Sequence, residues 1–147
     1  MIRSILAIAA LLTSFGVAAK TCELSIDGND QMKYSVAELK IDADCTEVKL
    51  TLNHTGKLAK NVMGHNWVLT NTADVQALAS DGMKAGAASD YLPADDARVL
   101  AHTKLIGGGE SDTITFSTAG LTAGGDYSFF CSFPGHWAVM KGKFVFG

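Results

Sequence analysis

The sequence has few residues that would prevent an ordinary compact fold. Only two of its 147 residues are proline, 18% are charged and 48% are hydrophobic. This composition excludes a disordered or collagen-like chain and is typical of one globular domain. Twelve Lys and Arg stand against 15 Asp and Glu, giving a formal net charge of -3, and no basic run occurs. Because a nucleic-acid surface needs clustered positive charge, we exclude nucleic acid as a partner.

The sequence also lacks a hydrophobic run long enough for a membrane-spanning helix, which needs about 20 apolar residues. The apolar stretch Ile5–Leu12 is shorter, follows Arg3 and precedes the small residues Val17–Ala19. These three parts are typical of a secretory signal peptide. We therefore predict a signal peptide over residues 1–19, and an exported single domain over residues 20–147 that is not inserted in the membrane.

Cysteine is scarce, and its number is odd. In an oxidising compartment, Cys22 and Cys45 are the favoured disulfide pair, which leaves Cys131 alone near the C-terminus. The alternative is that Cys131 pairs with one of the other two. An unpaired cysteine in an exported chain is typically reactive or a metal ligand.

Most of the chain alternates polar and apolar residues with the period of a β-strand. The alternation is unbroken in 47–53 and 112–117, which we interpret as antiparallel strands with one buried face. Shorter strands are predicted at 22–27, 34–41, 66–70, 100–106, 127–131 and 143–146, between turns rich in Gly, Asn and Asp. About eight strands predict an all-β, eight-stranded Greek-key sandwich or barrel.

One segment departs from this pattern. Between Asn71 and Gly86, apolar residues recur at helical spacing, with Asn71 or Thr72 as possible N-cap and Gly82 or Gly86 as possible end. The sequence predicts one short helix inserted between strands.

Three potential metal ligands that differ in softness lie close together in sequence, from the end of the predicted strand 127–131 onward. Cys131, His136 and Met140 fall within ten residues, and Pro134 and Gly135 allow that segment to fold as a loop. Thiolate, imidazole and thioether together suit copper better than a hard cation. A second imidazole would complete a trigonal plane, and His65, at the start of another strand, is the candidate. The four residues form the ligand set of a blue (type 1) copper centre, with one ion per chain.

Other interpretations of these residue types are weaker. We expect His54 to be a packed histidine and His102 a surface one, while Met32, Met63 and Met83 suit gap-filling or surface positions. Cys131 and His136 could be the nucleophile and base of a hydrolase, but no orienting carboxylate follows in the loop. Zinc could occupy the thiolate and imidazoles, but a structural zinc site would not use a thioether.

Segments 61–69, 129–136 and 140–142 resemble the two copper loops of the azurins, bacterial periplasmic proteins of the cupredoxin family. The similarity extends along residues 20–147, and the spacing of Cys131, His136 and Met140 matches the azurins rather than the shorter plastocyanin loop. The resemblance implies a Cys22–Cys45 disulfide, a buried Trp67, the Gly64 carbonyl as a distant second axial ligand, and hydrogen-bond donors to the Cys131 sulfur from Asn66 and the Phe133 backbone. The chain differs at Trp137, where azurins often have serine, which bears on the docking surface.

The resemblance also implies a function. It predicts a monomeric periplasmic carrier that passes single electrons through the copper centre and is not an enzyme. The ring edge of His136 is expected at the centre of an exposed apolar docking patch, formed by Met63, Phe133, Pro134, Trp137 and Val139. Transient redox partners such as c-type cytochromes or a copper nitrite reductase are implied. The alternative is a copper enzyme, or a copper store or chaperone.

Overall fold

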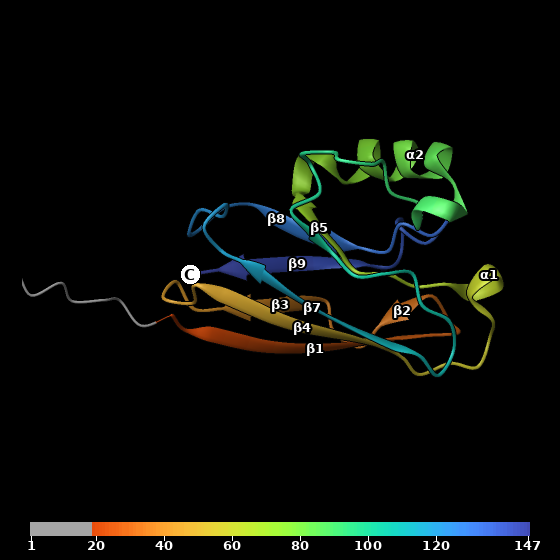
Figure 1. The fold of residues 1–147 in the computed structure, drawn as a ribbon, viewed down its shortest axis with the longest axis horizontal. Coiled ribbons are helices and arrows are strands. Elements are labelled where there is room, and N and C mark those ends of the chain that lie inside the picture. Colours follow the sequence, from red (N-terminus) through yellow and green to blue (C-terminus); the bar gives the residue numbers. More distant parts are fainter. Residues whose placement is uncertain (1–18) are drawn as a thin grey trace, which may run out of the picture.

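The computed structural model describes residues 19–147 as two β-sheets packed face to face (Figure 1). The predicted signal peptide therefore lies outside the described residues, except for Ala19. One sheet has the order β2-β1-β4-β7 and the other β3-β9-β8-β5-β6. The sheets remain separate, so the fold is a sandwich rather than a closed barrel.

The strands of the first sheet are β1 (Thr21–Asn29), β2 (Lys33–Tyr34), β4 (Glu47–His54) and β7 (Ser111–Ser117). Those of the second are β3 (Glu38–Ile41), β5 (Val68–Asn71), β6 (Ala101–His102), β8 (Tyr127–Phe130) and β9 (Lys141–Phe146). β4 pairs with β7 in the predicted antiparallel direction. Two pairings, β1 with β4 and β3 with β9, are parallel.

The core lies between the sheets and follows the alternation in the sequence. In β4, Val48, Leu50 and Leu52 are fully buried while residues between them are exposed or half-buried. They belong to the same core cluster as Trp67 and Phe129. Each fully buried side chain of this size contributes about 1.5–3 kcal/mol relative to exposure. The predicted burial of Trp67 is confirmed.

Two predicted strands are wrong in extent. The segment 34–41 forms two strands, because β2 pairs with β1 in one sheet while β3 pairs with β9 in the other. The chain crosses between layers after Ser35, whose N–H donates to the Asp27 carbonyl and whose hydroxyl accepts from the Asp27 N–H. The segment 100–106 is a strand only at Ala101–His102. The described residues thus form nine strands, not eight.

The inserted helix is present as α2 (Val75–Ala85), preceded by a 3-10 turn at Thr72–Asp74. It ends at Gly86, which has a φ of 81° and donates its N–H to the Gly82 carbonyl. Its apolar face packs over β5 and β8, in a cluster that includes Leu78 and Phe130 (Figure 1). Two shorter turns were not predicted, the one-turn helix α1 (Lys60–Met63) and a 3-10 turn at Ala87–Ser89.

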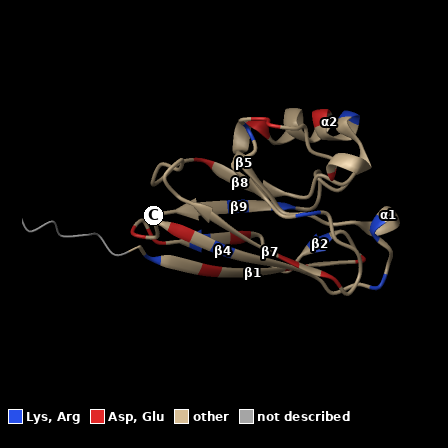
Figure 2. Ribbon diagram, in the orientation of Figure 1, with Lys and Arg blue, Asp and Glu red and all other residues tan. Residues whose placement is uncertain are grey.

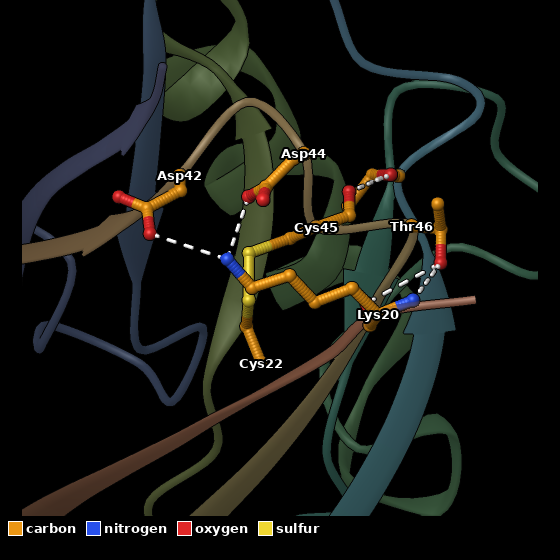
Figure 3. Close-up of polar contacts among 7 residues, drawn as sticks. Lys20, Cys22, Asp42, Asp44, Cys45 and Thr46 are labelled. Atoms are coloured by element: carbon orange, nitrogen blue, oxygen red, sulfur yellow. Dashed lines mark hydrogen bonds and ion pairs between the residues drawn. A yellow bond between two sulfur atoms is a disulfide. The ribbon is translucent and has the colours of Figure 1, made fainter. Parts of the chain in front are cut away.

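The predicted disulfide joins Cys22 in β1 to Cys45, just before β4, with the Cα atoms 5.8 Å apart. Beside it, the Lys20 ammonium group lies 2.7 Å from an Asp44 carboxylate oxygen and 3.4 Å from one of Asp42 (Figure 3). These ion pairs are exposed, so the covalent link is the main constraint on this end of the sandwich. Cys131 is the one free cysteine in residues 19–147. Within the same residues, no helix is long and apolar enough to span a membrane.

Candidate metal centre

The loop between β8 and β9 carries Cys131, His136 and Met140. Its shape is set by backbone hydrogen bonds: the Cys131 N–H donates to the Met140 carbonyl at 3.0 Å, and the Met140 N–H to the His136 carbonyl at 2.7 Å. Gly135 has a φ of 83°, a left-handed conformation that favours glycine. The loop therefore brings Cys131 and Met140, the two ends of this segment, together.

His65 reaches the same place from a different part of the chain. It follows the α1 turn and forms an isolated antiparallel bridge with Ile106, with N–H to carbonyl distances of 3.0 and 2.8 Å. Both backbone groups of His65 are thus held by Ile106, which fixes where its side chain starts.

The structure brings His65, Cys131 and His136 together. Their candidate ligand atoms all lie within 4.8 Å of one another. The Cys131 Sγ is 3.9 Å from Nδ1 of His65 and 3.6 Å from Nδ1 of His136. Cys131 and His65 are fully buried, and His136 is only 3% exposed. Among the described residues, this is the one such group of three or more His, Cys, Asp or Glu.

The orientation of the His65 ring is fixed by a neighbour that no sequence pattern indicates. Its Nε2 lies 2.8 Å from the carbonyl oxygen of Asn29 at the end of β1. Because a carbonyl only accepts, Nε2 carries the proton and Nδ1 keeps its lone pair toward Cys131. The buried His54 ring stacks on His65 with 4.3 Å between centroids.

His54 is held by two backbone groups and is not directed at the cluster. Its Nδ1 accepts the N–H of Gly56 at 3.1 Å, so its Nε2–H donates to the Met63 carbonyl at 2.7 Å. The prediction of a packed histidine is confirmed. His102 is exposed, as predicted.

Burial shifts the proton affinities of the three candidate ligands. It raises the pKa of the Cys131 thiol to about 12, although the backbone N–H groups of Asn66 and Phe133 favour the thiolate and lower the pKa. Burial also lowers the pKa of His136 to about 4 and that of His65 below its usual value. The imidazoles are therefore neutral near pH 7, as ligands must be, and a buried thiolate needs a cation to compensate its charge.

Two further candidate ligands border this cluster. The Gly64 carbonyl oxygen lies 3.8 Å from the Cys131 Sγ. Met140 is fully buried, and its Cε approaches Gly28 of β1 from the same side as the His65 ring. A Cβ on Gly28 would lie 2.8 Å from the His65 Cδ2 and 2.9 Å from the Met140 Cε. Gly28 is therefore glycine because the two side chains occupy this space.

Asn66 fastens the two ligand-bearing loops to each other. Its Oδ1 accepts the N–H of Ser132 at 2.8 Å, and its Nδ2 donates to the Ser132 hydroxyl at 2.7 Å and to the Asp90 carbonyl at 3.1 Å. The Ser132 hydroxyl also donates to the Asp90 carbonyl at 3.1 Å. The segment after α2 is thus tied to the candidate centre, and the Asn66 side chain is used for this clamp.

The five residues expected in an apolar patch differ in exposure. Pro134 is exposed, Val139 is 65% exposed, and the other three, Met63, Phe133 and Trp137, are half-buried. The Phe133 and His136 ring centroids are 4.6 Å apart. Val62, in the α1 turn, is 57% exposed and was not predicted.

Comparison with known proteins agrees with this geometry. The sequence-family model of the copper-binding proteins of the plastocyanin/azurin family matches residues 20–147 of this chain. An azurin of Achromobacter denitrificans is 54% identical over 140 residues, covering 95% of this chain and 94% of that protein. An azurin of Pseudomonas aeruginosa is 49% identical over 143 residues, covering 97% of each.

A solved structure extends the similarity to the whole fold. An azurin from the obligate methylotroph Methylomonas sp. strain J has a TM-score of 0.83 and 38% sequence identity, and the match covers 86% of this chain and 98% of that chain. The residues that match the family include both sheets and both loops that carry His65, Cys131 and His136. The chain therefore belongs to the plastocyanin/azurin family of copper-binding proteins.

Proposed function

We propose that this chain is a periplasmic electron carrier with one type 1 copper centre. The observation that supports this most directly is the buried group of one thiol and two imidazoles, all within 4.8 Å. A bound copper ion would supply the one-electron couple. The protein's part is to hold its donors in one arrangement, exclude water and leave a route to the surface.

The proposed ligands are His65, Cys131 and His136, with Met140 and the Gly64 carbonyl as weak axial ligands. Softness supports copper, because thiolate, imidazole and thioether are combined and no carboxylate joins the group. Rigidity supports electron transfer, because the Asn29 carbonyl orients His65 and the Asn66 clamp joins both loops. Little can move when the charge of the centre changes.

We infer a carrier rather than an enzyme from the same side chains. A catalytic copper site needs an open coordination position or a second metal. Here three side-chain donors lie close together in a buried position, and the buried Met140 is the proposed fourth. A copper store or chaperone would instead favour several Met or Cys ligands for the reduced ion, whereas two of the donors are imidazoles.

The proposed electron port is His136. Its ring packs against Phe133, and we assign Phe133, the exposed Pro134 and Val139 to one apolar surface. A contiguous apolar patch above a redox centre suits brief contacts with redox proteins, of which c-type cytochromes or a copper nitrite reductase are candidates. Monomeric protein would leave this patch accessible.

Export to the periplasm and a single domain over residues 20–147 complete the proposal. The disulfide suits an oxidising compartment, and the two sheets share one core cluster. The N-terminal residue of the purified native protein checks the cleavage after Ala19.

The proposed function predicts that Met63→Lys slows electron self-exchange between copies of the copper-loaded protein. An ammonium group at the contact is costly to desolvate and repels its counterpart, so we expect a decrease of roughly tenfold at low salt. Line broadening in mixtures of oxidised and reduced protein measures the rate. His102→Lys, which places the same charge on an exposed β6 residue, is the control. Equal slowing by both variants would contradict His136 as the port.

The ligand arrangement predicts a steric effect of Gly28→Ala. The added Cβ must displace the His65 ring or the Met140 methyl group, so we expect a shifted visible spectrum and about 1–3 kcal/mol lower free energy of unfolding. Gly120→Ala is the matched control, because a Cβ there meets no heavy atom within 4 Å. An unchanged spectrum for Gly28→Ala would place Met140 and His65 elsewhere in the loaded protein.

A further inference from the structure

A groove lies beside the proposed electron port and shares Val139 with the apolar patch. One wall comes from β2 and the crossing segment before β3, and the other from the end of the ligand loop and the start of β9. Val36 is 41% exposed and Val139 65% exposed. The lining residues are Lys33, Tyr34, Ser35, Val36, Ala37, Val139 and Lys141. The groove therefore has an apolar surface with an ammonium group from each wall.

The two lysines that line the groove are not neutralised by a carboxylate of this chain. Within residues 19–147, Lys33 and Lys141 form no ion pair, whereas Lys20, Lys49 and Lys84 each do. Both lysines are exposed, and Nζ of Lys141 lies 5.8 Å from the Trp137 ring centroid. Their charges are therefore available to an incoming molecule.

The two lysines of the groove stand in a chain whose net charge is negative. The chain has a formal net charge of -3. Figure 2 shows Lys and Arg at β2, at α1 and at the start of β9, and Asp and Glu at both ends of the sandwich. On the other side of the ligand loop, toward α2, the segment after the helix carries Asp90, Asp95 and Asp96. The field around the port is asymmetric.

We propose that this groove is part of the docking surface and receives an acidic segment of a redox protein, with carboxylates reaching Lys33 and Lys141 around an apolar side chain placed on Val36 and Val139. The inference rests on the proposed function and extends it, because it states the charge of the partner and the side of the port on which it sits. Complementary charge raises the association rate and sets orientation without requiring a tight complex.

A protein fits these features better than a membrane or a nucleic acid. Two lysines around an apolar groove give only a small positive area. The carboxylates of Asp90 and Asp95 after α2 would repel a broad anionic surface placed across the port, whereas Asp96 is paired with Arg98. A compact acidic segment can contact the groove and avoid them.

The experiment compares two reversals of charge in the copper-loaded full chain. The test variant is Lys33→Glu with Lys141→Glu, and the control is Lys40→Glu with Lys49→Glu, which changes the net charge equally but outside the groove. The probes are a c-type cytochrome with a lysine-rich haem edge and the same cytochrome after succinylation of its lysines. Stopped-flow absorbance gives the second-order rate constants over a range of salt concentrations.

We expect the unmodified chain to react faster with the succinylated cytochrome, with a rate that falls as salt is added. The groove variant should lose roughly tenfold of this rate at low salt, and the control much less. Equal losses in both variants, or no preference for the succinylated probe, would overturn the proposal. The proposal would also be overturned if the groove variant lost binding to vesicles that contain anionic phospholipid while its rate with the succinylated cytochrome stayed unchanged. The groove would then be a membrane contact.

Failure of the proposed function would look different. In that case the unmodified chain would show no visible band that a mild reductant bleaches reversibly, and neither cytochrome would exchange electrons with it. If the visible band bleaches reversibly but both cytochromes react at the same rate, only the proposal for the groove is overturned.

Discussion

The Cys131→Ser variant is expected to fold but to lose the intense visible absorption of the copper-loaded protein completely. The band requires a thiolate donor, and a serine hydroxyl stays protonated in this buried position. The fold should persist because the Cys22–Cys45 disulfide and the inter-sheet core do not involve Cys131. Visible absorbance after loading with Cu(II), together with the circular dichroism melting curve, measures both effects.

The position of the disulfide provides a check on this result. If the variant retained the band, Cys131 would not be the thiolate ligand. Peptide mapping of the non-reduced protein is a second readout, and finding Cys131 in a disulfide would contradict the assignment independently of colour.

Replacing both Cys22 and Cys45 by serine should have the opposite pattern. Removing a cross-link between residues 23 positions apart should lower the free energy of unfolding by about 3 kcal/mol, because the unfolded chain regains freedom. The visible spectrum should be unchanged, since the link joins β1 to the start of β4, at the end of the sandwich opposite α1 (Figure 1). Denaturant titration of the metal-free protein measures the first effect.

A control separates this loss from simple cavity formation at Cys45, which is buried. The parent protein with its disulfide reduced retains both sulfur atoms, so it should be destabilised to a similar extent. A changed visible spectrum in the double variant would show that the disulfide shapes the centre, contrary to the separation seen in the structure.

The parts of the fold that were predictable are those with a local signal. The alternation in 47–53 predicted the buried face of β4. The helical spacing of apolar residues and Gly86 predicted α2 and its end. Alternation favours antiparallel pairing and does not say which strands are neighbours, so the parallel β1–β4 and β3–β9 pairings could not be predicted. The segment 100–106 is strand-like in composition, but the Thr103 hydroxyl accepts the Trp67 N–H in place of a ladder bond, and the strand ends at His102.

The same distinction applies to the candidate centre. Cys131, His136 and Met140 are neighbours in sequence, so their softness and spacing were informative. The groups that orient His65 and hold the ligand loop at Ser132 are distant in sequence: the Asn29 carbonyl is 36 positions from His65, and the Asp90 carbonyl is 42 positions from Ser132. A backbone carbonyl leaves no mark in sequence. Gly28 is a position near the centre whose residue type can be seen in the sequence. A glycine in a strand can also mark a bulge or a bend, so it did not indicate the site.

The parallel β3–β9 ladder has a consequence for the order in which the molecule forms. It pairs Glu38 with Lys143, which are 143 - 38 = 105 positions apart, and such non-local pairing slows folding. β9 begins directly after Met140, so the ligand loop is closed only when the C-terminal strand joins β3 and β8. We infer that a chain still lacking residues 141–147 could form much of the β1–β4–β7 sheet without a competent centre. Metal would then bind only after the fold is complete, and metal binding would not initiate folding.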